Sequence, residues 1–82
     1  MTTYHRSDLA REAVAKAARE HRVNPAAIIG HERNRRVQPA RRYAAWLMRH
    51  LLGMSFAEIG YVLGQRDHTT VMYMLNVLKE QA

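Results

Sequence analysis

The segment GQRDHTTVMY, residues 64–73, places several hydrogen-bonding side chains next to one another. Asp67, His68 and two threonines run directly into the apolar residue Val71. A carboxylate, an imidazole and two hydroxyls could begin a helix, catalyse a reaction or bind another molecule. Each of these three interpretations requires different residues elsewhere in the chain.

The first interpretation is a helix start. Asp67 is a good N-cap, and Val71, Leu75 and Leu78 follow it at helical spacing. A cap alone does not account for Arg66 or for two consecutive threonines, which are indifferent helix formers.

The second interpretation is catalysis, with Asp67 or His68 activating a nucleophile such as Ser55 or Thr70. Adjacent residues on a helix point about 100° apart, so we do not expect Asp67 to orient His68. A chain this small offers neither an oxyanion hole nor a deep pocket. The histidines stand at positions 5, 21, 31, 50 and 68, without HxxxH or HExxH spacing. We therefore expect no catalytic residue, no metal and no cofactor.

The third interpretation is nucleic-acid recognition by the first turn of a helix. Aspartate can accept a hydrogen bond from the amino group of cytosine, and threonine offers a methyl group to thymine and a hydroxyl to phosphate. Histidine can donate to bases or phosphates, and the backbone amides at a helix N-terminus also suit a phosphate. This interpretation gives each residue type of the segment a role.

Composition favours a polyanionic partner. The chain has 82 residues, enough for one domain, and 13 Lys and Arg against 7 Asp and Glu give a formal charge of +6. Eleven of the 13 basic residues are arginine, whose planar fork suits phosphates and guanine edges. Nucleic acid is the first expectation, an acidic membrane surface the second and an acidic protein the third. The chain has no cysteine, which is compatible with a reducing cytoplasm.

The hydrophobic pattern predicts helices and no strand alternation. We expect helices at about 7–21, from Asn24 to Gly30, from Pro39 to about 52, from Ser55 to Leu63, and from Asp67 onward, with residues 31–38 as a basic loop. Leu9 and Leu51 are expected on the apolar faces of their helices. The last two helices are joined by a tight turn containing Gly64, as in a helix-turn-helix. No apolar run approaches the roughly 20 residues needed to cross a bilayer, so we expect a cytoplasmic protein.

At this point the sequence resembles a known family. IGYVLGQRDHTTVMY, residues 59–73, is similar to the signature of the C-terminal DNA-binding domain of DnaA, the bacterial chromosomal replication initiator. The arginine-rich loop, the helix start at 37–41, Trp46 and the S-x-x-E-I-G at 55–60 follow in the family's order. The resemblance covers about residues 8–80 and implies that 1–82 is one all-α domain, a small helical bundle containing a Trp-repressor-like helix-turn-helix.

The resemblance also implies roles for individual residues. Those expected to contact bases are Asp67, His68 and Thr69 in the major groove and Arg33 in the minor groove. Those expected to contact the DNA backbone are Thr70, Arg66, Arg41, Arg42, Arg49, Arg35 and Arg36. The implied target is double-stranded DNA carrying a DnaA box, TTATNCACA, bound in the control of replication initiation or of transcription.

Four features depart from the family pattern, one of which is Arg42 in place of a common Gln or His. His31 and Glu32 stand where the family usually has more than one basic residue ahead of the loop arginine. The run from Met74 to Leu78, apolar except for Asn76, replaces a small residue and basic ones, which predicts either a repacked core or a partner surface such as a homodimer through the last helix. No G-x-x-x-x-G-K-[ST] loop occurs, so we expect no nucleotide binding and no ATPase activity.

Two alternatives to DNA binding remain at this stage. The chain could be a protein-interaction module that acts through its apolar last helix, or, less in keeping with arginines spread over loop and turn, a membrane-surface binder. It could equally be an excised domain or a free-standing protein.

Overall fold

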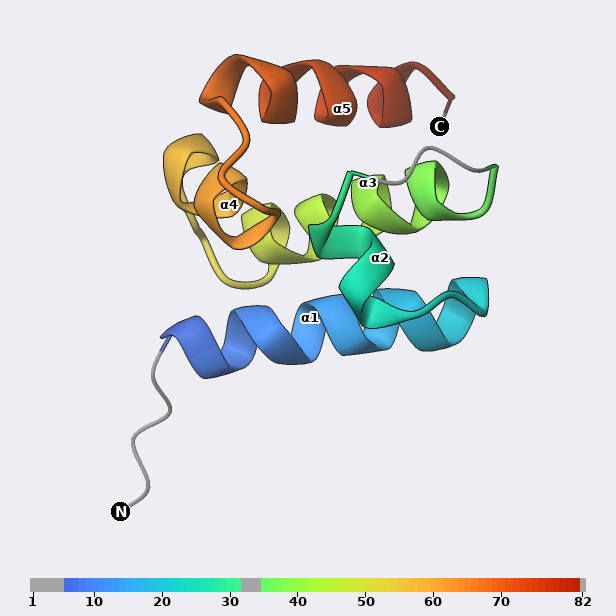
Figure 1. Cartoon of the computed structure of the whole chain (residues 1–82). Helices are drawn as coiled ribbons and strands as arrows, with labels where there is room; N and C mark the ends of the chain where they lie inside the picture. The colour runs from blue at the N-terminus through green and yellow to red at the C-terminus, as the bar shows by residue number, and fades with distance from the viewer. Residues whose placement is uncertain (1–5, 32–34, 82) are drawn as a thin grey trace.

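The computed structural model describes the backbone of residues 6–31 and 35–81, and the side chains of 8–31 and 35–76. The described backbone forms five α-helices and no strand (Figure 1), which confirms the predicted all-α class. They are α1 (Arg6–His21), α2 (Pro25–Ile29), α3 (Val37–His50), α4 (Phe56–Val62) and α5 (His68–Gln81). None of the helices in this part of the chain is long and apolar enough to span a bilayer.

The third helix is the centre of the fold. It packs against each of the other four helices, and α1 and α5 lie on opposite sides of it (Figure 1). Several of the buried core residues of α1 and α3 are small: Ala10, Ala17, Ala40, Ala44 and Ala45 are all fully buried. Because these side chains are short, the two helices can approach closely. The third helix therefore separates α5 from α1.

Local capping determines where α2 and α4 begin, as the sequence predicts. Asn24 precedes α2 and its Oδ1 accepts a hydrogen bond from the Ala26 amide at 2.9 Å. At α4 the Ser55 Oγ accepts from the Glu58 amide at 3.1 Å, and the Glu58 Oε1 accepts from the Ser55 amide at 3.0 Å. This reciprocal pair is the predicted capping box.

Three details of the prediction were wrong. The third helix begins at Val37, two residues before Pro39, because the first turn of a helix has no amide partners to lose and accommodates a proline. In α1, Ala10 is buried while Leu9 is 36% exposed. Leu51 is 68% exposed because α3 ends at His50 and the chain turns away from the core.

A tight turn of residues 63–67 joins α4 to α5, which confirms the helix-turn-helix. Gly64 and Gln65 both have positive φ, +88° and +61°, which reverses the chain within a few residues. The Arg66 amide donates to the Gly60 carbonyl at 2.7 Å. A side chain at Gly60 would collide with the Arg66 carbonyl, so this glycine allows the turn to pack on α4. Gly60 and Gly64 thus fix where α5 starts.

Candidate nucleic-acid interface

The polar segment singled out in the sequence forms the start of α5. Asp67 lies just before the helix, and its carbonyl accepts from the Thr70 amide at 3.0 Å and the Val71 amide at 3.3 Å. Its Oδ1 accepts from the Thr69 amide at 3.4 Å. Asp67 is therefore the N-cap that the sequence predicts. The side chains of residues 67–70 are all exposed, so capping leaves them open to a partner.

Asp67 and His68 also contact each other, contrary to the sequence-based argument. The His68 Nδ1 lies 2.9 Å from the Asp67 Oδ1. The 100° separation applies to two residues within a helix, whereas Asp67 precedes α5, which begins at His68. A hydrogen bond from the Thr69 side chain lowers the pKa of the Asp67 carboxyl, with the Thr69 amide and His68 adding to the effect. The carboxylate is thus held as a charged acceptor.

The described part of α5 has one inward and one outward face. Val71 and Met74 are buried against the core, whereas Tyr73 is 69% exposed and Met72 is 41% exposed. Sequence reasoning missed Tyr73 as an interface candidate. The signal was its position, four residues after Thr69 and three after Thr70, which places it on the same helical face. The outward face therefore extends one turn beyond the predicted cluster.

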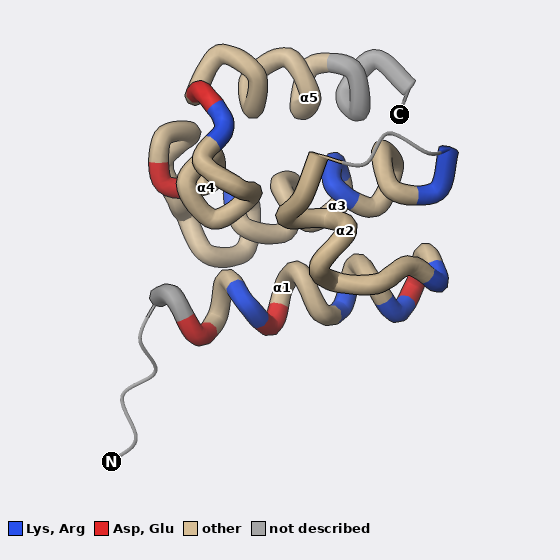
Figure 2. The backbone as a smooth tube through the Cα atoms, in the orientation of Figure 1, with Lys and Arg blue, Asp and Glu red and all other residues tan. Residues whose placement is uncertain are grey.

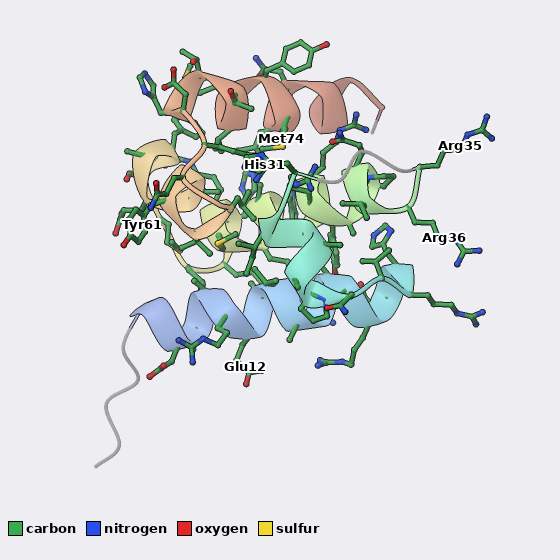
Figure 3. All side chains as sticks on the ribbon, in the orientation of Figure 1. Glu12, His31, Arg35, Arg36, Tyr61 and Met74 are labelled. Atoms are coloured by element: carbon green, nitrogen blue, oxygen red, sulfur yellow. The ribbon has the colours of Figure 1, made fainter. Side chains whose placement is uncertain are left out.

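A hollow of about 520 Å³ lies beside this face. The residues that line it come from four separate parts of the chain and include His31, Arg42, Arg66, Thr70, Tyr73 and Met74. Figure 3 shows His31 and Met74 side by side beneath α5. Arg42 is half-buried there. The structure therefore brings four predicted backbone contacts, Arg41, Arg42, Arg66 and Thr70, to one basic depression.

Arg41, also predicted to contact phosphate, is a buried residue. Only 2% of it is exposed, and its guanidinium donates to the carbonyls of α2. Its Nε lies 2.8 Å from the Ile28 oxygen, and its Nη2 lies 2.9 Å from that of Ala27 and 3.1 Å from that of Gly30. These donors are directed at carbonyls of the protein, and the expectation that Arg41 contacts the DNA backbone remains a prediction. The burial of Arg41 could have been predicted from its spacing in the sequence. Position 41 lies four residues after Val37 and three before Ala44, on the buried face of α3.

Arg66 is half-buried and is bonded to the same end of α2. Its Nη2 lies 2.6 Å from the Gly30 oxygen, its Nη1 lies 3.3 Å from that of Ile29, and Nη1 also donates to the Leu63 carbonyl. Burial lowers the pKa of this arginine. These donors are directed at the protein, and the expectation that Arg66 holds a phosphate remains a prediction.

Arg49 stabilises the connection between α3 and α4. Its Nη1 donates to the Met54 carbonyl at 2.9 Å, and its guanidinium carbon lies 4.3 Å from the centre of the Phe56 ring. The residue is half-buried, and a phosphate contact for it stays a prediction.

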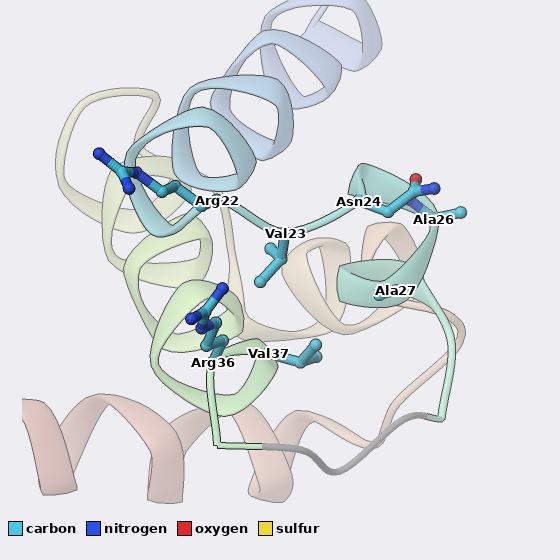
Figure 4. Close-up of a pocket in the computed structure, with 7 residues that line it drawn as sticks. All are labelled: Arg22, Val23, Asn24, Ala26, Ala27, Arg36 and Val37. Atoms are coloured by element: carbon cyan, nitrogen blue, oxygen red, sulfur yellow. The ribbon is translucent and has the colours of Figure 1, made fainter.

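Arg35 and Arg36, just before α3, are both exposed but point in different directions. In Figure 3 Arg35 is directed toward the side of α5 and Arg36 toward the side of α1. Arg36 lines a second hollow of about 500 Å³ together with Arg22 and residues of α2 (Figure 4). Arg33, the predicted minor-groove residue, lies outside the described residues.

Charge is distributed unevenly over the described chain. Residues 21–31 and 35–57 contain six arginines and no Asp or Glu. Figure 2 shows acidic positions on α1 and α4 and at the start of α5, and basic positions on α1, at the start of α3 and in the turn before α5. An anionic partner is therefore favoured on the side where α3 begins and α5 lies.

The short helix α4, its glycine turn and the outward face of α5 make this a DNA-binding protein of the helix-turn-helix class. A family model described as "Bacterial dnaA protein helix-turn-helix" matches residues 11–77. The chain therefore belongs to this DnaA family, as the RDHTT signature indicated.

Curated relatives agree with this assignment. Over 77 residues, 93% of the chain, it is 42% identical to the chromosomal replication initiator protein DnaA of Thermomicrobium roseum. Over 71 residues, 87% of the chain, it is 37% identical to the protein of the same name from Thermus thermophilus. These matches cover 17% and 16% of the two relatives, so the chain spans about a sixth of their length. No solved structure matches the chain.

Proposed function

We propose that this protein binds double-stranded DNA sequence-specifically, at sites resembling the DnaA box. The observation that carries the proposal is the exposed turn at residues 67–70, which begins α5 beside the basic hollow. A helix N-terminus in the major groove would bring Asp67, His68 and Thr69 to base edges, with Thr70 and Arg42 at the backbone. Arg33, Arg35 and Arg36 would act from the segment before α3, with Arg33 in the minor groove.

The biological role that best fits the family is control of replication initiation. The relatives named above are replication initiators, and a domain that reads their sites could recruit such a protein to an origin or compete with it. Regulation of transcription from the same sites is the second role. In either role this chain would act as a cytoplasmic DNA-associated protein without nucleotide binding or ATPase activity, since its sequence has no G-x-x-x-x-G-K-[ST] loop.

Selection from a random duplex library tests the proposal directly. We expect enrichment of one asymmetric site related to TTATNCACA. Titrations of the selected duplex should show an affinity that falls with salt at a log-log slope of about −5, as expected for around six phosphate contacts. Failure to enrich any sequence, together with a slope near zero, would reject DNA recognition.

The alternative of a protein-interaction module receives limited support from the described part of α5. Val71 and Met74 face the core, which fits a repacked interior, while Met72 and Tyr73 remain outward. The homodimer through α5 remains a prediction. Sedimentation that shows one monomeric species at all concentrations up to tens of micromolar would contradict it.

A further inference from the structure

The end of α2 is held by two arginine side chains from distant parts of the chain. A helix leaves its last four carbonyls without intrahelical partners, and α2 has only five residues. Gly30 follows it in an extended conformation with φ −78°, so the usual left-handed cap is absent. Something else must satisfy these carbonyls.

Arg41 and Arg66 together supply the missing donors. Arg41 bonds the oxygens of Ala27 and Ile28, and Arg66 bonds that of Ile29. Both reach the Gly30 oxygen, Arg41 at 3.1 Å and Arg66 at 2.6 Å. Four consecutive carbonyls are thereby capped by two guanidinium groups. Charged donors also suit the negative end of a helix dipole.

These bonds join the two elements that are expected to reach DNA. Arg66 lies two residues before α5, and Gly30 comes directly before the segment that leads to Arg35 and Arg36. His31 continues the contact, since it lines the hollow beside Thr70 and Met74. The start of α5 and the start of the basic segment are therefore tied to each other directly, independently of the hydrophobic core.

We propose that Arg66 and Arg41 are positioning residues that hold Gly30 and His31, where the chain enters the basic segment, against the start of α5, and hence align two groove contacts on one DNA site. The inference rests on the proposed function. Arginine is required because its planar fork reaches several carbonyls at once, whereas the ammonium of lysine is a single point of donation. We call the bonds of Arg41 and Arg66 to the end of α2 the clamp. A protein in which the clamp is weakened should still recognise bases through α5. It should lose discrimination between base pairs at the positions that the basic segment contacts.

The variant Arg66→Lys tests this while keeping the charge. Binding is measured by fluorescence anisotropy on the selected duplex and on duplexes with one base pair changed at a time. The variant Thr69→Ala first identifies the base pairs that α5 reads. We expect Arg66→Lys to reduce discrimination at the remaining positions about tenfold, and to leave discrimination at the α5 positions within about twofold. Equal losses at both groups of positions would overturn the proposal. So would a uniform loss over all sequences in Arg66→Ala with a salt slope smaller by about one, which marks a simple phosphate contact.

A second measurement needs no DNA and separates this inference from the proposed function. The Gly30 amide is bonded to the Ala26 carbonyl at 2.9 Å, and its hydrogen exchange reports whether α2 stays closed. We expect about tenfold faster exchange in Arg66→Lys, with no change in Arg42→Ala. The Leu51 amide, bonded to Leu47, serves as an internal reference for global unfolding. An unchanged Gly30 rate would overturn the clamp even if the protein binds DNA as proposed. If the wild type binds no specific site, the exchange rates alone show whether the bonds of Arg66 keep the end of α2 closed.

Discussion

Gly64 lies directly against the carbonyl oxygen of Ile29, so that a side chain at position 64 would collide with the backbone of α2. The glycine also has φ +88°, a region that other residues enter at a cost. This single position therefore allows both the turn of the helix-turn-helix and its close approach to α2. Both the fold of the turn and the placement of the candidate interface depend on the absence of a Cβ atom at Gly64.

We expect Gly64→Ala to destabilise the protein by more than about 3 kcal/mol, because the variant combines backbone strain with a backbone collision. Gly53→Ala is the matched control: Gly53 also has positive φ, +63°, but nothing lies within 4 Å of the position where its Cβ would be. That variant should lose only about 1 kcal/mol. Urea denaturation of both measures the difference, and equal losses would show that the Ile29 contact contributes nothing.

Arg41 provides a second prediction about stability. Arg41→Ala leaves buried carbonyls at the end of α2 without donors, so we expect the free energy of unfolding to fall by about 2–4 kcal/mol. Arg42→Ala, at the adjacent half-buried position, should change it by less than about 0.5 kcal/mol. If Arg41→Ala instead preserves stability and weakens binding to every DNA sequence equally, Arg41 is a phosphate contact after all.

Arg41 and Arg66 show which structural roles the sequence could predict and which it could not. Local signals predicted α2, α4 and the start of α5, because a cap acts within three or four residues and the signal for it is equally local. The buried role of Arg41 was available in its spacing but conflicted with the usual exposure of arginine. The role of Arg66 was not available, because it depends on a carbonyl 36 residues away that only the folded chain brings near. Long-range contacts of this kind have no pattern in a single sequence.

Base reading and backbone binding should separate in two variants. Thr69→Ala removes a side chain from the exposed first turn of α5, and we expect a loss of about 1–3 kcal/mol on the selected duplex with relaxed specificity. Arg42→Ala should weaken binding to all duplexes about equally and reduce the salt slope by about one. Competition titrations with selected and scrambled duplexes measure both effects. Identical behaviour of the two variants would contradict the division of roles.

The last prediction concerns acid stability and follows from Asp67. Hydrogen bonds from Thr69 and the neighbouring His68 lower the pKa of this carboxyl below its ordinary value, so its charged form stabilises the folded state. That stabilisation is present above about pH 4 and is lost as the pH falls through the lowered folded value. Asp67→Asn keeps an oxygen that can cap α5 but carries no charge. We therefore expect a lower melting temperature than the wild type at about pH 7 and convergence of the two once the pH falls below the lowered pKa of Asp67 in the folded state. Thermal melts recorded by circular dichroism across this pH range measure the effect, and a difference that stays constant would show that capping geometry, not charge, is what Asp67 contributes.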